Sequence, residues 1–426
     1  MCAGGALGVP AAVRAASVDY PQRSTVVARS FQAASGVQVT QITDFRFGNQ
    51  LSYYDIPCYA PSIERLVYNT VVSVPPGKSP KKNKPNKDSG YLNGAVWGVV
   101  SCRLDGSDPR LLVTRLPATS STVRIDMSQD GKLVTYTRFN DAPDSGWDLY
   151  GFRPGVGRQV EEFRITQLRT LAESTNRVKT SPAAWDARAA KYLCSFSIDD
   201  TVWLVYDDGK GPGGNRGPTS APLTDLADFP ERRQSETSFH RIRLNPAFAN
   251  LLYYRRNGVR DNWAVDLFAP APKSRRITDY QASIHATWTP DGRILAGSMK
   301  GPWMEWTVAD SDGRLLSQIA SRGMGSFGRN GRPGIFYGCY SNDGQRLAVA
   351  TRYDQEPGGS LWLMNRETGK AAYLCKTRYF GPVVAGQPRL GFIDHDRAIV
   401  FSSDNSVGRS ASQPPQIFLV RPLPQV

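Results

Sequence analysis

Histidine, long apolar segments and closely spaced cysteines are all scarce in this chain of 426 residues. It contains three histidines, so a zinc site made of three or four of them would use the entire supply, which disfavours most metalloenzyme classes. No run of about 18 apolar residues occurs, and this excludes a membrane-spanning helix. The six cysteines have no CxxC or CxxxxC spacing, which excludes a zinc ribbon. We expect them to be buried small apolar residues rather than disulfides.

Positive charge, by contrast, is abundant. The chain has 52 Lys and Arg against 38 Asp and Glu, a formal charge of +14 at pH 7, and this excess favours an acidic partner. Outside residues 78–87 the basic residues are spread along the chain and are not clustered with aromatics, so nucleic-acid binding is not expected. We interpret residues 78–87 and the Gly- and Pro-rich residues 209–222 as solvated loops.

The N-terminal residues are small and apolar. Residues 2–16 are similar to the second half of a secretory signal, with residues 13–15 as a small-x-small cleavage site, although the charged segment that should precede it is missing. We therefore expect residues 1–17 to be a truncated signal-peptide-like segment and the mature protein to be periplasmic or secreted. A tail without regular structure is the alternative.

A strand–turn–strand pattern recurs along the chain, whereas helical periodicity is scarce. Its clearest copies carry Asp-Gly between alternating strands, because this turn needs a positive φ. They lie at Asp130-Gly131, Asp291-Gly292 and Asp343-Gly344. With the weaker copies included, the turn centres fall near residues 62, 130, 188, 249, 291, 343 and 395, which are 42 to 68 residues apart.

This spacing predicts the architecture. Each unit is long enough for four strands, and four-strand repeats of about 40–50 residues are typical of a β-propeller. We therefore predict an all-β fold, a seven-bladed β-propeller with four antiparallel strands per blade, in which residues 18–426 form a single domain. The pattern sets no oligomeric state.

Two of the three histidines occupy related positions in the repeat. His240 and His285 lie in the first strands of the fourth and fifth units, each five or six residues before its turn, so both are expected near the central channel. A structural hydrogen-bonding role is the alternative, because fold alone does not identify a ligand. His395 lies within the last turn and is expected at the surface.

The two histidine motifs resemble those of the oligogalacturonate lyase family of seven-bladed propellers, and the Pro-Asp-Gly turns resemble TolB-type repeats. The resemblance is weak from residue 39 to residue 404 and strongest at residues 240–246 and 285–292. It implies that His240 is the base of a β-elimination and that His285 ligates a divalent metal, usually manganese. It also implies an acidic, pectin-derived oligosaccharide as substrate.

The last unit departs from the family pattern. There the family completes its metal site with histidines, whereas this chain has Gln387-Pro388-Arg389. Gln387 could remain a ligand beside His285, but Arg389 would repel a cation, and manganese prefers several oxygen and nitrogen ligands. We therefore expect the metal to be weakly held or absent.

Arginine offers a replacement for the metal. β-Elimination of a uronate needs a base and a positive group that stabilises the enolate-like charge. We hypothesise that His240 is the base and that Arg389 binds the uronate carboxylate with its guanidinium fork. Arg241 or Arg243 is a candidate second clamp, although strand alternation places both opposite His240 unless a bulge intervenes.

Three aromatic residues complete the set of candidates. Tyr54, Trp288 and Tyr340 lie near inner strands, where they either stack on sugar rings or belong to the apolar core. A second hypothesis for the whole protein is a non-catalytic, TolB-like binding or scaffold protein of the periplasm with a degenerate metal site.

Overall fold

The chain is almost entirely β-strand in the computed structural model. The structure describes residues 29–32, 36–43, 49–52, 56–73, 96–117, 125–140, 146–155, 160–168, 178–198, 201–221, 239–249, 251–256, 263–269, 275–276, 283–292, 294–300, 303–309, 315–319, 335–351, 358–379, 389–403 and 416–426. Within these ranges the one helical element is the short 3-10 helix η1 (Pro61–Ile63). No helix in them is long and apolar enough to cross a membrane.

The described strands form seven antiparallel sheets, which we number along the chain. Sheet 1 contains β3 (Asn49–Gln50), β4 (Tyr59–Ala60), β5 (Arg65–Ser73), β6 (Val96–Arg103) and β7 (Arg110–Pro117). Sheet 2 contains β8 (Ile125–Met127), β9 (Val134–Asn140), β10 (Gly146–Phe152) and β11 (Glu162–Gln167). Sheet 3 contains β12 (Val178–Thr180), β13 (Ala184–Asp186), β14 (Lys191–Ile198), β15 (Thr201–Tyr206) and β16 (Thr219–Ala221).

The remaining sheets follow in the same way. Sheet 4 contains β17 (Phe239–Leu244), β18 (Leu251–Arg256), β19 (Trp263–Asp266) and β20 (Arg275–Arg276). Sheet 5 contains β21 (Ser283–Trp288), β22 (Ile294–Lys300), β23 (Trp303–Ala309) and β24 (Leu315–Ile319). Sheet 6 contains β25 (Ile335–Tyr340), β26 (Arg346–Thr351), β27 (Gly358–Asn365) and β28 (Ala371–Tyr379). Sheet 7 contains β29 (Leu390–Ile393), β30 (Ala398–Ser403), β31 (Gln416–Arg421), β2 (Gln38–Gln41) and β1 (Arg29–Gln32).

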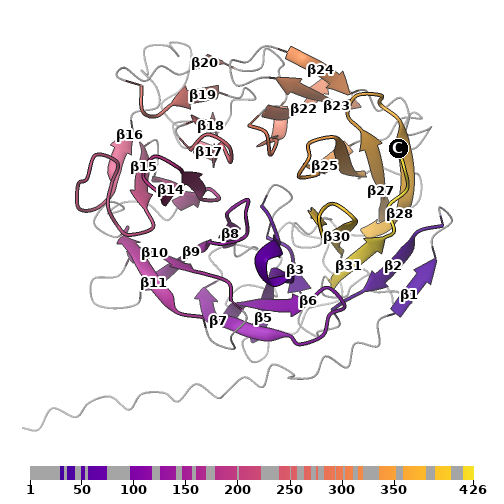
Figure 1. Ribbon diagram of the computed structural model, residues 1–426, viewed down its shortest axis with the longest axis horizontal. Helices are drawn as coiled ribbons and strands as arrows, with labels where there is room; N and C mark the ends of the chain where they lie inside the picture. Colours follow the sequence, from indigo (N-terminus) through magenta and orange to yellow (C-terminus); the bar gives the residue numbers. More distant parts are fainter. Residues whose placement is uncertain are drawn as a thin grey trace, which may run out of the picture.

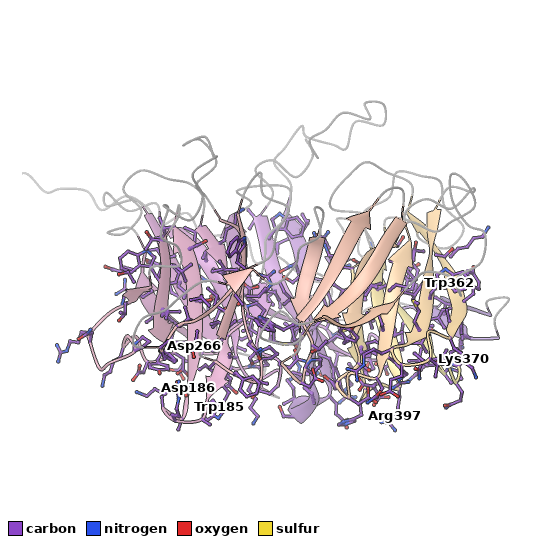
Figure 2. The ribbon with its side chains drawn as sticks, turned by 90° about the horizontal axis from the view of Figure 1, so that it is seen from above. Trp185, Asp186, Asp266, Trp362, Lys370 and Arg397 are labelled. Atoms are coloured by element: carbon purple, nitrogen blue, oxygen red, sulfur yellow. The ribbon has the colours of Figure 1, made fainter. Side chains whose placement is uncertain are left out.

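The sheets are arranged in order around a common centre (Figure 1). The last strands of the sheets, such as β7, β11 and β24, lie at the outer rim, so the first strands lie on the inner side. Seen from the side, the strands run between two faces, and the turns that carry Asp186 and Arg397 lie on the same one (Figure 2). We call this face, formed by the turns between first and second strands, the turn face. The predicted all-β class is therefore confirmed. Sheets 2, 4, 5 and 6 have the predicted four antiparallel strands, whereas sheets 1, 3 and 7 each have a fifth.

The two ends of the chain meet in sheet 7. Strand β2 pairs with β31 from Gln38↔Arg421 to Gln41↔Phe418, so N-terminal and C-terminal strands share one sheet. A buried polar cluster joins this sheet to sheet 1, because Gln416 Oε1 accepts hydrogen bonds from Thr43 Oγ1 (2.8 Å) and Asn49 Nδ2 (3.1 Å). The closing contact thus combines a strand ladder with hydrogen bonds between side chains more than 360 residues apart.

All seven predicted turn centres fall between the first and second strands of a sheet. In sheets 2, 5 and 6 the turn has the same internal bonding, in which a Ser or Thr hydroxyl donates to the Asp two residues later. Ser128 donates to Asp130 (2.7 Å) and Ser341 to Asp343 (2.5 Å), and Thr289 makes the same bond to Asp291. Local chemistry therefore specifies these turns.

One predicted loop contains a strand. Residues 219–221 of the Gly- and Pro-rich segment form β16, which pairs with β15 from Val202↔Ala221 to Leu204↔Thr219. The prediction of an entirely solvated loop over residues 209–222 is therefore wrong for these three residues. The glycines precede this stretch, and an outer strand needs a ladder on one edge only. The predicted loop at 78–87 and the signal-like residues 1–17 lie outside the described residues.

The apolar core consists of layers shared by neighbouring sheets. Clusters of buried side chains connect sheets 1 and 2, 2 and 3, 3 and 4, 6 and 7, and 7 and 1. In the first of these, Trp97 of β6 and Tyr136 of β9 are both fully buried. In these five clusters the described sheets therefore bury their faces against their neighbours, and each cluster is shared by two sheets.

The cysteines of the described chain behave as small apolar residues. All five, Cys58, Cys102, Cys194, Cys339 and Cys375, are buried and free, which confirms the prediction for them; Cys2 lies outside the described residues. Burial raises the pKa of Cys58 and of Cys102 to about 12. Their thiols therefore remain protonated at neutral pH.

Gly131 tests the packing of one turn on the next sheet. Its φ is +70°, and an added Cβ would lie 2.7 Å from the Cα of Ala60 in sheet 1. Gly369 has a similar φ of +67° with no atom within 4 Å, so it is a matched control. We expect Gly369→Ala to lower the free energy of unfolding by about 1–2 kcal/mol, the cost of a left-handed Ala, and Gly131→Ala to lower it by about 1–3 kcal/mol more. Urea denaturation of both variants measures the difference, and equal losses would contradict this packing.

Candidate functional site

The inner strands of three neighbouring sheets each carry a β-bulge near the position of the predicted histidines. In β17 the register moves from Phe239↔Arg256 to Arg241↔Arg255, so His240 is the extra residue. In β21 it moves from Ile284↔Gly297 to Thr287↔Leu295, so His285 lies in the bulged stretch. Strand β25 has the same irregularity between Ile335 and Tyr337. Bulges redirect side chains and are over-represented beside active sites.

The bulge in β17 affects which faces of the strand His240 and Arg241 occupy. Strict alternation would place Arg241 on the face opposite His240, and the extra residue removes that alternation between them. The side chains of His240, Arg241 and His285 lie outside the described part of the structure, and so do Tyr54 and Gln387 as whole residues. Their roles remain predictions.

Arg389 is buried at the inner start of sheet 7, with 1% of its surface exposed. Its Nη1 donates to the backbone oxygen of Leu51 (2.8 Å) and to that of Ser52. The guanidinium therefore ties sheet 7 to the segment of sheet 1 that follows β3. The carboxylate contact of Arg389 that the sequence suggests stays a prediction.

Arg243 and Trp288 form similar links between sheets. Arg243 is 3% exposed, and its Nη1 donates to the backbone oxygen of Thr180 in sheet 3 (3.0 Å). The indole nitrogen of Trp288 in sheet 5 donates to the backbone oxygen of Arg243 in sheet 4 (2.8 Å).

Trp288 and Tyr340 are both buried, which favours the alternative that they belong to the core. His395 is exposed in the turn before β30, as expected.

Further polar contacts continue this pattern around the ring. Ser52 of sheet 1 bonds both backbone groups of Ile125 in sheet 2, and Thr180 of sheet 3 donates to the Asp126 carboxylate in sheet 2. Arg346 of sheet 6 donates to the backbone oxygen of Asp396 in sheet 7 (2.8 Å). The first strands and their turns are thus connected by buried hydrogen bonds as well as by apolar packing.

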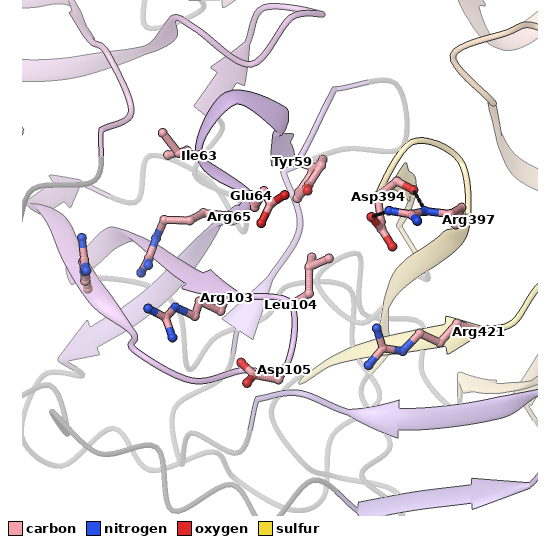
Figure 3. A pocket seen from close by; sticks show the side chains of 11 residues that line it. Tyr59, Ile63, Glu64, Arg65, Arg103, Leu104, Asp105, Asp394, Arg397 and Arg421 are labelled. Atoms are coloured by element: carbon pink, nitrogen blue, oxygen red, sulfur yellow. Dashed lines mark hydrogen bonds and ion pairs between the residues drawn. The ribbon is translucent and has the colours of Figure 1, made fainter.

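Sequence reasoning missed a pocket of about 700 Å³ on the turn face, between sheets 7 and 1. Its arginines come from both sheets: Arg65 and Arg103 from sheet 1, and Arg397 and Arg421 from sheet 7 (Figure 3). Arg110 also lines it. These arginines lie in separate segments of the sequence, so no local sequence motif indicates that they form a cluster.

The charges of this pocket, which we call the arginine pocket, are only partly compensated. Arg65 Nη1 (2.9 Å) and Arg110 Nη2 (2.6 Å) share the carboxylate of Asp108. The hydrogen bond from Arg110, followed by the interactions with Arg65, holds the pKa of Asp108 below its ordinary value. Among the described carboxylates none forms an ion pair with the exposed Arg103 or Arg421. Glu64, Asp105 and Asp394 also line the pocket, and Asp105 interacts electrostatically with Arg103. Five arginines thus face three carboxylates, and the net positive lining suits an anionic group.

The donors that the sequence offers for a metal, His285 and Gln387, suit manganese poorly. The described residues contain no group of three or more His, Cys, Asp or Glu placed to hold a metal ion. The expected ligands are His285 and Gln387 alone, and the buried cation Arg389 follows Gln387 two residues later. Two donors beside a guanidinium are a poor set for manganese.

Comparison with known proteins supports the fold. No family model matches the sequence, and no curated protein is significantly similar to it. An oligogalacturonate lyase solved in complex with manganese is 14% identical and superimposes with a TM-score of 0.60, over 93% of this chain and 96% of that chain. The oligogalacturonate lyase of Vibrio parahaemolyticus is 13% identical with a TM-score of 0.57, over 92% of this chain and 96% of that one.

Other propellers are more distant. The β-propeller domain of the Trilobed protease from Pyrococcus furiosus is 11% identical with a TM-score of 0.48, over 88% of this chain and 94% of that chain. TolB structures also match, with lower scores. At these identities the likeness to the two oligogalacturonate lyases shows the fold alone.

The contacts of Arg389 predict a measurable contribution to stability. Arg389→Met removes the donor for two buried backbone oxygens, and we expect it to lower the free energy of unfolding by about 2–4 kcal/mol. Arg397→Met is the matched control, because the Arg397 side chain is 71% exposed and pairs with Asp394 on the surface. We expect that control to lose less than about 1 kcal/mol. Chemical denaturation measures the free energy of unfolding of both variants. An Arg389→Met protein as stable as the control would show that these contacts do not stabilise the fold.

Proposed function

We propose that this protein is a seven-bladed β-propeller lyase that cleaves uronate-containing, pectin-derived oligosaccharides by β-elimination. Each of the seven sheets is one blade, residues 18–426 are one domain, and the protein acts in the periplasm or outside the cell after export. The observation that carries this proposal is the pair of bulges at His240 and His285 on adjacent inner strands. Structural likeness to two oligogalacturonate lyases over nearly the whole chain supports it.

His240 is the proposed base. It removes the proton on the carbon next to the uronate carboxylate, and the electron pair forms a carbon–carbon double bond as the glycosidic oxygen leaves. The leaving oxygen takes up a proton from the protonated base or from water, so the reaction needs no co-reactant. Arg389, with Arg241 or Arg243, supplies positive charge for the enolate-like intermediate. No step is assigned to a metal, because His285 and Gln387 alone are a poor donor set for manganese.

The net positive lining of the arginine pocket supports an acidic ligand. Arg103 and Arg421 are exposed there, and the pocket opens on the turn face. A polyuronate chain carries one carboxylate per residue, which matches guanidinium groups contributed by separate turns.

A non-catalytic, TolB-like scaffold is the second candidate, and specific contacts favour it. Arg389 and Arg243 are both buried and both hydrogen-bonded to backbone oxygens of a neighbouring sheet. The two arginines proposed to bind substrate thus already stabilise the fold. This is expected of a propeller that has kept its fold and lost its catalytic activity.

Activity on oligogalacturonate separates these candidates. We expect trigalacturonate to yield an unsaturated product, detected by its ultraviolet absorbance, at a rate that EDTA leaves unchanged. The rate should rise with pH around a midpoint near pH ~6.5, because the base acts in its neutral form. Loss of activity on adding EDTA would contradict the replacement of the metal by arginine.

The assignment of the base has its own variants. We expect His240→Ala to lower kcat by about 10²–10⁴-fold. His395→Ala, in an exposed turn, is the matched control and should keep the parent rate. Equal rates for the two variants would rule out His240 as the base, and no product from any polyuronate would favour the scaffold.

A further inference from the structure

A second pocket on the turn face lies between sheets 2 and 3, and its chemistry differs from that of the arginine pocket. It has a volume of about 760 Å³, which is within the range of small-ligand sites. Its walls are the turn between β8 and β9, the turn between β13 and β14, and Pro246 from the corresponding turn of sheet 4. The two pockets therefore occupy equivalent gaps between successive sheets.

An exposed aromatic platform forms part of this pocket. Trp185 of β13 is 46% exposed, an unusual exposure for its size in the described residues, and it lies on the turn face (Figure 2). Its ring packs edge-on against Tyr192 of β14, with centroids 5.0 Å apart and planes at 65°. The apolar face of an indole is a surface on which the C–H face of a sugar ring stacks.

Fixed polar groups stand beside the platform. The Asp130 carboxylate accepts hydrogen bonds from Ser128 Oγ (2.7 Å), from the Lys132 backbone nitrogen (3.1 Å) and from the Tyr192 hydroxyl. The Arg153 guanidinium lies over the Tyr192 ring at 5.7 Å. Both groups are held in place before a ligand arrives, which lowers the entropic cost of binding. A carboxylate and a guanidinium together match the donor and acceptor of neighbouring sugar hydroxyls.

The charges of this pocket are balanced. Each cation that lines it has an acidic partner: Arg153 pairs with Asp207 (2.6 Å), Lys191 with Asp208 (2.7 Å) and Lys132 with Asp130 (3.9 Å). No cation is left over for a uronate carboxylate, in contrast to Arg103 and Arg421 of the arginine pocket.

We propose that the pocket between sheets 2 and 3 binds a neutral saccharide, with one sugar ring stacked on Trp185 and its hydroxyls bonded to Asp130 and Arg153. This site is separate from the bulges of β17 and β21, and it does not depend on the lyase activity proposed above. It would let the protein hold a neutral part of a mixed polysaccharide while acidic residues bind elsewhere.

Calorimetric titration of the full chain tests this proposal. The probes are three neutral tetrasaccharides, cellotetraose, β-1,4-galactotetraose and maltotetraose, with tetragalacturonate as the charged counterpart. We expect at least one neutral probe to bind, with an affinity that does not change with salt. Trp185→Ala should weaken it about tenfold or more, and Trp185→Phe, which keeps an aromatic face, should weaken it less.

Phe248→Ala is the matched control. Phe248 is 54% exposed in the corresponding turn of sheet 4 and does not line the pocket, so this variant should bind within about twofold of the parent. Binding of no neutral probe would overturn the proposal, and so would equal affinities for Trp185→Ala and Phe248→Ala. Tighter, salt-sensitive binding of tetragalacturonate that is lost with Trp185→Ala would overturn the assignment to a neutral sugar.

Discussion

Buried hydrogen bonds between neighbouring inner strands are the constraint on which this structure depends. A polar group taken out of water costs free energy unless it finds a partner. Here Ser52, Asp126, Arg243 and Arg389 are all buried, and each bonds a residue of the adjacent sheet. Apolar contact is not directional, whereas each hydrogen bond between sheets fixes the relative position of two backbone segments. Pairing of β2 with β31 in sheet 7 then joins the two ends of the chain.

The hydrogen bonds between neighbouring sheets also position the strands of the candidate site. Strands β17 and β21 carry the two bulged histidines, and Trp288 ties the strands together through the backbone oxygen of Arg243. Arg389 holds the other side of the centre against sheet 1. A residue that positions a strand in this way has limited freedom to move toward a substrate. The same contacts therefore support a preorganised lyase and, equally, a propeller with a structural role only, which is why activity decides between them.

The sequence predicts the turns well, but it does not predict contacts between residues that are far apart along the chain. Three of the seven turns gave the clearest signal, because Asp130-Gly131, Asp291-Gly292 and Asp343-Gly344 encode their own hydrogen bonds and positive φ within four residues. The exposure of His395 followed from its place in such a turn. The contact of Arg389 with Leu51 joins residues 338 positions apart, and no local pattern announces it. The same holds for both pockets, whose walls come from separate sheets, and for the bulges, which depend on the partner strand.

In the proposed function a uronate binds at the inner strands, between the bulges of β17 and β21 and the start of β29. A crystal structure of the His240→Ala protein soaked with trigalacturonate would test this binding site, since loss of the base should preserve the bound substrate. We expect a uronate ring there, with its carboxylate on Arg389 and no metal ion beside it. An inner space filled by the protein's own side chains, or a manganese ion held by His285 and Gln387, would contradict it.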